Sequence, residues 1–253
     1  MGTVQRAPVT AVVLLVALLT GVEAAVGLGP VGWAVGLAAS TAGAALLAVG
    51  LRRSATTRFG AANVVTLVRA TLGQAVAALV AASFAGLDNR VLLISLTAVA
   101  LTLDLVDGRV ARRTGSVTAL GARFDMETDA FLILVLSVAA GPVVGWWVLA
   151  IGLARYALLL AEGVWPWLRV PVPRRHWRKV VAGVQGVTLA FVVSGLVPIV
   201  AASALVLVAL GLLAESFGRD VVWLSRRRRA LTAYQRAVVA IPSIVPLART
   251  TGG

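Results

Sequence analysis

The stretch DLVDGRVARRTGSVTALGARFDMETD, residues 104–129, holds five of the ten acidic residues of the chain and is flanked by long runs rich in Ala, Val and Leu. Its aspartates come in two pairs with helical spacing. Asp104 and Asp107 are three residues apart, and Asp125 and Asp129 are four apart, so each pair lies on one face of a helix. Turn-forming residues separate the pairs. The stretch therefore predicts a helical hairpin that brings the two pairs face to face.

The rest of the chain is strongly apolar. Of its 253 residues, 60% are hydrophobic and 13% are charged, and the mean hydropathy is +0.96, which indicates an integral membrane protein. Crossing a bilayer core of about 30 Å takes roughly 20 helical residues. We expect an all-α membrane protein with eight spanning helices, at 8–27, 31–50, 62–84, 91–111, 120–140, 143–163, 180–198 and 199–218.

Three parts follow from this pattern. We expect a two-helix N-terminal extension with a basic link, a six-helix core and a basic tail, at 1–58, 59–218 and 219–253. The first apolar run lacks a charged leading region and a small-residue cleavage site, so we expect it to remain as a helix. Pro242 and Pro246 argue against a long helix in the tail.

Basic residues define the expected orientation. They gather in links that alternate along the chain, at 52–58, 109–113, 174–179 and 226–229. Only Arg90 falls in a loop on the other side, so the basic side, the acidic stretch and both termini are expected in the cytoplasm. We expect a multi-pass protein of a bacterial plasma membrane. The net charge of +13 suits anionic lipid headgroups or phosphate substrates, and the apolar bulk excludes a nucleic-acid partner.

The acidic stretch must also be explained chemically. With no Cys and one His in the chain, a metal would be held by oxygen, which indicates Mg²⁺, Mn²⁺ or Ca²⁺. A charged residue at the centre of a membrane helix costs about 2.5–3.5 kcal/mol, so the carboxylates need a positive partner. One interpretation is a salt-bridged cap that uses arginines at 109–113. The other is a pair of cations that would clamp the attacking and leaving oxygens of a phosphoryl displacement.

Small residues accompany the aspartates. Gly108 and Ala111 follow the first pair by one helical turn, and Gly121 precedes Asp125 by one turn. They leave room for a ligand against the backbone, or they let helices pack closely. Both interpretations stay open at this point.

The complete spacing is Asp104-x2-Asp107-Gly108-x2-Ala111-Arg112-x8-Gly121-x3-Asp125-x3-Asp129. This pattern resembles the signature of the CDP-alcohol phosphatidyltransferases, with every spacing met, and the resemblance extends over 59–218. In ANVVTLVR, the residues Asn63, Thr66 and Arg69 are similar to the Asn-x2-Thr-x2-Arg that begins the first core helix of the family. Alternatively, Asn63 caps this helix and Arg69 reaches out to the membrane surface.

The resemblance implies a transfer that depends on two Mg²⁺ or Mn²⁺ ions, in phospholipid biosynthesis. The hydroxyl of an alcohol attacks a CDP-linked lipid such as CDP-diacylglycerol, and CMP leaves. The implied metal ligands are Asp104, Asp107, Asp125 and Asp129, and Asp129 is also implied to accept the proton of the hydroxyl. The implied nucleotide-binding residues are Gly108, Ala111, Arg112, Gly121, Asn63, Thr66 and Arg69. The resemblance also suggests a homodimer.

The acceptor alcohol is not fixed by this pattern. Basic residues that could hold an acceptor phosphate are Arg123, Arg155, Arg174, Arg175 and Lys179. Arg155 lies within an expected span, and Glu162 on the same face is an alternative, structural partner. The basic link at 174–179 could simply anchor the chain at the membrane. Glycerol-phosphate-type relatives have Lys after the last Asp and inositol-phosphate-type relatives have Arg, whereas this chain has Ala130. A polyol phosphate such as glycerol 3-phosphate or inositol phosphate remains the expected acceptor class.

Two other functions fit the acidic residues less well. An aromatic prenyltransferase would carry its two acidic motifs far apart in sequence, whereas here they share one hairpin. A divalent-cation transporter or channel would need polar residues along a path through the bilayer. Here the acidic residues stop at the cytoplasmic end, and the stray Glu23 and Arg155 are too few to line such a path.

Overall fold

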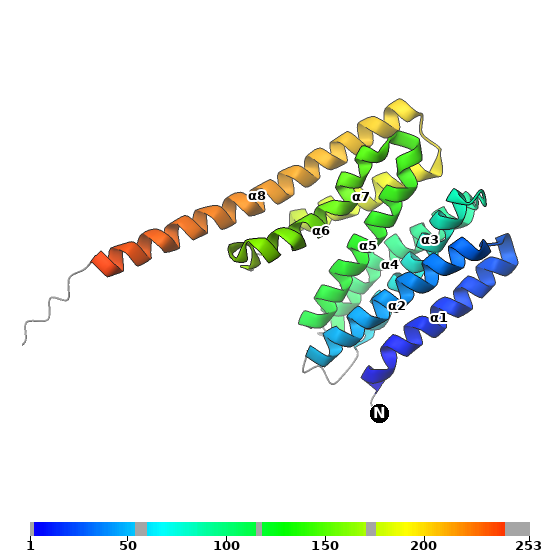
Figure 1. The fold of residues 1–253 in the computed structure, drawn as a ribbon, viewed down its shortest axis with the longest axis horizontal. Coiled ribbons are helices and arrows are strands. Elements are labelled where there is room, and N and C mark those ends of the chain that lie inside the picture. The colour runs from blue at the N-terminus through cyan, green and yellow to red at the C-terminus, as the bar shows by residue number, and fades with distance from the viewer. Residues whose placement is uncertain (1–2, 54–59, 115–117, 171–175, 241–253) are drawn as a thin grey trace, which may run out of the picture.

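The computed structural model describes residues 3–53, 60–114, 118–170 and 176–240, with side chains from 7 onward except at 61, 105–114, 119, 176 and 231–240. Within these ranges the chain is helical and contains no strand (Figure 1). The long helices are α1 (Thr3–Val26), α2 (Gly29–Arg53), α3 (Ala61–Phe84), α4 (Arg90–Thr114), α5 (Ala119–Val144), α6 (Leu149–Val164), α7 (His176–Ser194) and α8 (Ile199–Ala240). Two short 3₁₀ helices are η1 (Trp146–Val148) and η2 (Pro166–Arg169).

Six stretches of the described chain are long and apolar enough to cross a membrane: Ala7–Val26, Gly29–Arg53, Ala62–Phe84, Leu120–Val144, Trp146–Val164 and Ile199–Ala230. The helices α4 and α7 complete the bundle, α4 by packing on α3 and α7 by packing on α5 and α8. The predicted fold class, an all-α membrane protein with a six-helix core behind two extra helices, is confirmed.

The helix α3 lies at the centre of the bundle. It packs against α1 and α2 on one side and against α4 and α5 on the other, and every residue from Thr71 to Val80 is buried. Glycine permits the close approach of α2, since a Cβ on Gly32 would lie 3.0 Å from the carbonyl oxygen of Ala78. Because α3 touches both halves of the acidic hairpin, its side chains can join them.

Two helix boundaries differ from the sequence prediction. The expected break before 143 is absent, because α5 continues through Pro142 to Val144 and turns at Gly145, which has a positive φ of 98°. Only Gly adopts such a conformation readily. The last expected helix also ends too early at 218, since α8 is 42 residues long, runs to Ala240 and extends beyond the other helices (Figure 1). No proline interrupts 199–240, so the helix can run unbroken through this range.

Candidate metal and nucleotide site

Three aspartates converge at one end of the bundle, which we name the acidic end. Asp104 comes from α4, and Asp125 and Asp129 come from adjacent turns of α5. Each offers one carboxylate oxygen, and these oxygens lie within 4.8 Å of one another. Their side chains are about one-third exposed, at 38%, 32% and 32%. We call this group the Asp cluster; it brings together the two halves of the hairpin as the spacing predicts.

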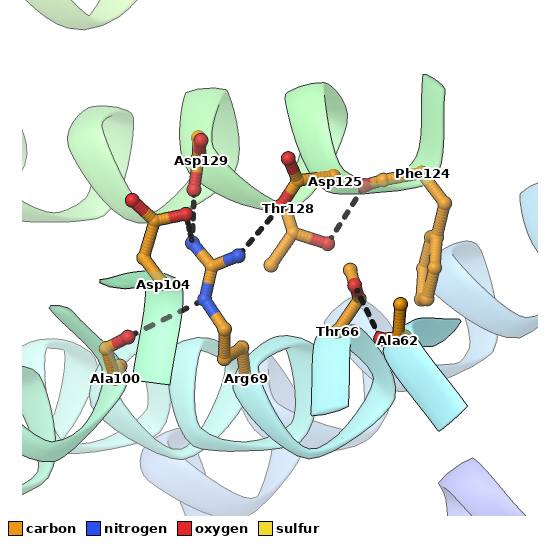
Figure 2. A network of polar contacts seen from close by, with 9 residues as sticks. All are labelled: Ala62, Thr66, Arg69, Ala100, Asp104, Phe124, Asp125, Thr128 and Asp129. Atoms are coloured by element: carbon orange, nitrogen blue, oxygen red, sulfur yellow. Dashed lines mark hydrogen bonds and ion pairs between the residues drawn. The ribbon is translucent and has the colours of Figure 1, made fainter. Parts of the chain in front are cut away.

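Arg69 of α3 lies in the middle of the Asp cluster (Figure 2). Its Nη2 lies 3.0 Å from Oδ1 of Asp104, its Nη1 lies 2.6 Å from Oδ1 of Asp125, and Nη2 also pairs with Asp129. Its Nε donates to the carbonyl oxygen of Ala100 at 3.3 Å. The side chain is only 2% exposed, so the suggestion that Arg69 reaches out to the membrane surface is wrong.

The charges of this group do not balance. Three ionised carboxylates around one guanidinium leave a formal charge of −2 in a partly buried place. Uncompensated charge of this kind is costly away from water. The donors are all carboxylate oxygens, which suit hard divalent cations. The residues present therefore fit Mg²⁺ or Mn²⁺, with Arg69 as a fixed positive charge beside the cation site.

Several expected site residues fall where side chains are not described. The backbone of α4 carries Asp107, Gly108, Ala111 and Arg112, so Asp107 lies one turn beyond Asp104 on the same helix. Two further candidates, Arg174 and Arg175, lie outside the described residues.

Gly121 and Asn63 form a close contact between α5 and α3. A Cβ on Gly121 would collide with Oδ1 of Asn63 and would lie 3.0 Å from Oγ1 of Thr118. Thr118 caps α5 by accepting from the backbone N–H of Gly121 at 3.0 Å. The small size of Gly121 thus serves helix packing, and the space that its side chain would fill is taken by Asn63.

Asn63 is 4% exposed, and its Nδ2 has no hydrogen-bond partner within the described part of the chain. It does not cap α3, because Gly60 is the N-cap and no side chain bonds to that helix end. Thr66, also buried, donates its hydroxyl to the carbonyl oxygen of Ala62 at 3.1 Å (Figure 2). A buried donor without a partner is costly, so Asn63 is suited to bind a ligand group with an acceptor atom.

The basic candidates for an acceptor site are separated. Arg155 of α6 pairs with Glu127 at 2.8 Å, on a different face of α5 from Asp125 and Asp129. The suggested partner Glu162 is not used by Arg155; its backbone carbonyl instead accepts from Nε of Arg169 at 2.8 Å. The expected Arg155–Glu162 pair is therefore wrong.

Two other basic candidates remain accessible. Arg123 and Lys179 are both exposed. Arg123 lies on α5 beside Asp125, and Lys179 lies in the first turn of α7, which packs on α4 and α5, the helices that carry the Asp cluster.

Sequence reasoning missed the role of Arg69 as the partner of three aspartates. A signal was available, because Arg69 is the only charged residue between 61 and 84. A single arginine inside an apolar helix requires a partner, and the acidic hairpin is the nearest concentration of negative charge in the sequence.

The bundle and the Asp cluster together define a helical membrane protein with three carboxylates at one end that could hold a metal ion. A family model, CDP-alcohol phosphatidyltransferase, matches residues 59–214. The match covers more than half of the chain, so this protein belongs to that family. Its members transfer a phosphatidyl group from a CDP-alcohol to an alcohol in phospholipid biosynthesis, and they generally use divalent metals. Searches of curated proteins and of solved structures returned no match.

Proposed function

We propose that this protein transfers the phosphatidyl group of CDP-diacylglycerol to the hydroxyl of a polyol phosphate and releases CMP. The observation that carries the proposal is the Asp cluster, whose three carboxylates outnumber the one guanidinium among them. Cations would balance the excess negative charge of the Asp cluster. In the reaction of this family, such cations would bind the diphosphate of the CDP-linked substrate. A glycerol phosphate or an inositol phosphate is the acceptor class that we favour.

In this proposal the Asp cluster and Asp107 hold two Mg²⁺ or Mn²⁺ ions. When bound, the ions would neutralise the diphosphate and polarise its phosphorus–oxygen bonds. Asp129 accepts the proton of the acceptor hydroxyl, so that the oxygen can attack phosphorus as the bond to CMP breaks. Arg69 holds Asp104, Asp125 and Asp129 at a fixed spacing and balances part of their charge.

The nucleotide lies along the same end of α3, α4 and α5. The residues assigned to it are Gly108, Ala111, Arg112, Gly121, Asn63, Thr66 and Arg69. Support comes from the unpartnered Nδ2 of Asn63, which would donate to an acceptor on the nucleotide. Gly121 contributes indirectly, because the absence of a Cβ there lets Asn63 pack against α5.

For the acceptor phosphate we favour Lys179, because it is exposed at the start of α7, which packs on α4 and α5, with Arg123 and the link residues Arg174 and Arg175 as further candidates. Arg155 is assigned to a structural pair with Glu127. We also propose that the acidic end faces the cytoplasm, since the arginine-rich links gather there. We further propose that the chain is divided into an N-terminal extension at 1–58, a catalytic core at 59–218 and a basic tail at 219–253. We also propose that the protein works as a homodimer.

One assay tests the reaction and the acceptor together. Purified full-length protein in lipid nanodiscs is given CDP-diacylglycerol, and CMP release is measured with glycerol 3-phosphate, inositol phosphate, inositol, serine or phosphatidylglycerol. We expect release only with Mg²⁺ or Mn²⁺ and only with a polyol phosphate. Chelation with EDTA stops the reaction, and re-adding either metal restores it.

A matched pair of variants controls this assay. Asp125→Asn removes one charge from the Asp cluster and is expected to stop CMP release. Glu127→Gln removes one charge from another face of the same helix, two residues away, and leaves release intact. Equal activity in both variants would overturn the assignment of the site. Cation flux into liposomes without any nucleotide would instead favour a transporter.

A further inference from the structure

The seven tryptophans of the chain lie at two levels of the bundle, six of them at or near helix ends and Trp223 within α8. Those at the end opposite the Asp cluster are Trp33, Trp146 and Trp147, near the starts of α2 and α6. Those at the acidic end are Trp165, Trp167, Trp177 and Trp223, from the end of α6, η2, the start of α7 and α8. Tryptophan concentrates at membrane–water interfaces. The two groups therefore mark the two bilayer surfaces.

The spacing of these groups agrees with a bilayer. From Trp147 to Trp165 the chain rises about 27 Å at 1.5 Å per residue, close to the ~30 Å of a hydrocarbon core. Along α8, the path from Ile199 to Arg226 is about 40 Å, whereas a bilayer with its headgroups measures about 40–45 Å. The four consecutive arginines Arg226–Arg229 consequently lie in the headgroup layer at the acidic end.

Two contacts with tryptophan rings hold Arg227 and Arg228 at this depth in the bilayer. The guanidinium of Arg228 lies 5.6 Å from the ring centroid of Trp167, and that of Arg227 lies 5.3 Å from the ring of Trp223. Both rings belong to the tryptophan group at the acidic end. Guanidinium groups over aromatic rings are held there by cation–π attraction.

The preceding turns of α8 are tied to α7. Glu215 accepts from Nε1 of Trp177 at 2.9 Å, and Asp220 pairs with Nε of Arg178 at 3.4 Å. Glu215 also pairs with Arg219. The acidic residues of this part of α8 are thus engaged with other basic groups, and the helix cannot slide along the membrane normal without breaking these bonds.

Four consecutive helical residues point in directions 100° apart, so Arg226–Arg229 surround α8 and do not form one face. All four are exposed. A protein or nucleic acid docking from one side would reach only part of this ring. Headgroups of an annular lipid layer reach every direction except that of η2, over whose Trp167 Arg228 lies, and phosphate oxygens match the donors of guanidinium groups.

We propose that Arg226–Arg229 form a binding ring for the headgroups of anionic phospholipids, at the depth set by Trp167 and Trp223. The ring holds a shell of anionic lipid around α8 and fixes the height of this helix in the bilayer. This inference rests on the position of α8 in the membrane and not on the proposed reaction, so the two can fail separately.

The test compares lipids around the full-length protein in phosphatidylcholine vesicles. Spin-labelled phosphatidylglycerol or spin-labelled phosphatidylcholine is added, and electron paramagnetic resonance gives the fraction of label that the protein immobilises. We expect about a fivefold preference for phosphatidylglycerol at low ionic strength, the size of effect that one basic residue near an anionic surface produces. The preference should decrease as salt is added.

Three variants make the test decisive. Replacing Arg226–Arg229 with Gln is expected to abolish the preference, whereas replacing all four with Lys keeps most of it because the charge remains. The control Arg52→Gln with Arg53→Gln removes exposed arginines at the end of α2 and keeps the preference. Circular dichroism and size-exclusion chromatography confirm that each variant is folded. The proposal is overturned if the folded Gln variant retains the wild-type preference for phosphatidylglycerol. It is also overturned if the Gln variant loses the binding of soluble heparin but keeps its lipid selectivity.

Discussion

Two faces of α5 carry ionic contacts of different kinds. On one face Asp125 and Asp129, with Asp104 of α4, surround the buried guanidinium of Arg69. On another face Glu127 makes a single pair with Arg155 at 2.8 Å. The first arrangement has an excess of negative charge, and the second is neutral.

The difference separates a site from a structural contact. A neutral pair satisfies both partners and needs nothing more, so its loss affects the packing of α5 on α6. The Asp cluster has three carboxylates for the one guanidinium of Arg69, and bound cations can balance this excess. Charge balance therefore distinguishes the two faces, although all the acidic residues come from one short stretch of sequence.

The largest effect that distinguishes the faces is expected from Asp129→Asn. Removing a general base typically costs about 10²–10⁴-fold in rate, and we expect a decrease of this size in CMP release. Binding of Mn²⁺, followed by electron paramagnetic resonance, should weaken in the same variant. Glu127→Gln serves as the control and should bind Mn²⁺ as the wild type does. Unchanged turnover in Asp129→Asn would remove Asp129 from the mechanism.

Arg69→Gln tests the charge imbalance directly. EDTA removes any bound metal, and the variant then leaves three carboxylates without the buried guanidinium of Arg69. Breaking a buried ion pair in this way costs about 3–5 kcal/mol. Thermal unfolding in detergent should show a lower midpoint, and added Mg²⁺ should raise that midpoint more than it does for the wild type. Arg69→Lys keeps the positive charge and should lower the unfolding midpoint less than Arg69→Gln does. A midpoint in EDTA equal to that of the wild type would show that Arg69 does not stabilise the Asp cluster.

Gly121→Ala tests how closely α3 must approach α5 beside the Asp cluster. The added methyl group would collide with Asn63, and overpacking of this kind costs about 1–3 kcal/mol. We expect a lower unfolding midpoint, measured in the same detergent. The double variant Gly121→Ala with Asn63→Ala removes the collision and should recover most of the stability. If the double variant were no more stable than Gly121→Ala alone, the contact would not be the cause.

The smallest effect is expected at the neutral pair. A double-mutant cycle with Glu127→Gln and Arg155→Met should give a coupling of about 1 kcal/mol or less, since Glu127 is 39% exposed and Arg155 is 22% exposed. The coupling is measured by unfolding and should shrink with added salt. Coupling as strong as that between Arg69 and Asp125 would mean that the two faces of α5 do not differ as described.

Much of the fold was predictable from the sequence. Apolar runs of membrane-spanning length gave the helices, because a membrane segment must satisfy its own backbone hydrogen bonds. The boundary at Gly145 and the length of α8 were not predicted correctly. Apolar composition marks where the hydrocarbon ends and not where a helix ends, so a helix that continues into water leaves no sign in hydropathy.

The site was predictable to the extent that it is local. Asp104, Asp125 and Asp129 were expected to meet because each pair has helical spacing within one hairpin, and the structure brings them together. The structural partners of two arginines were not foreseen. The aspartate partners of Arg69 were not predicted, and Arg155 was considered for an acceptor phosphate with Glu162 as the alternative partner, because which helices pack together was not known.

The sequence by itself determined that this is a helical membrane protein with a conspicuous acidic hairpin, since hydropathy and helical spacing are properties of neighbouring residues. Only the tertiary structure decided which positive charge meets which negative charge. Because α3 packs against both α4 and α5, Arg69 lies among three aspartates. Because α6 packs beside α5, Arg155 pairs with Glu127. Those contacts join residues far apart in the chain, and their energy depends on burial, which no short stretch of sequence specifies.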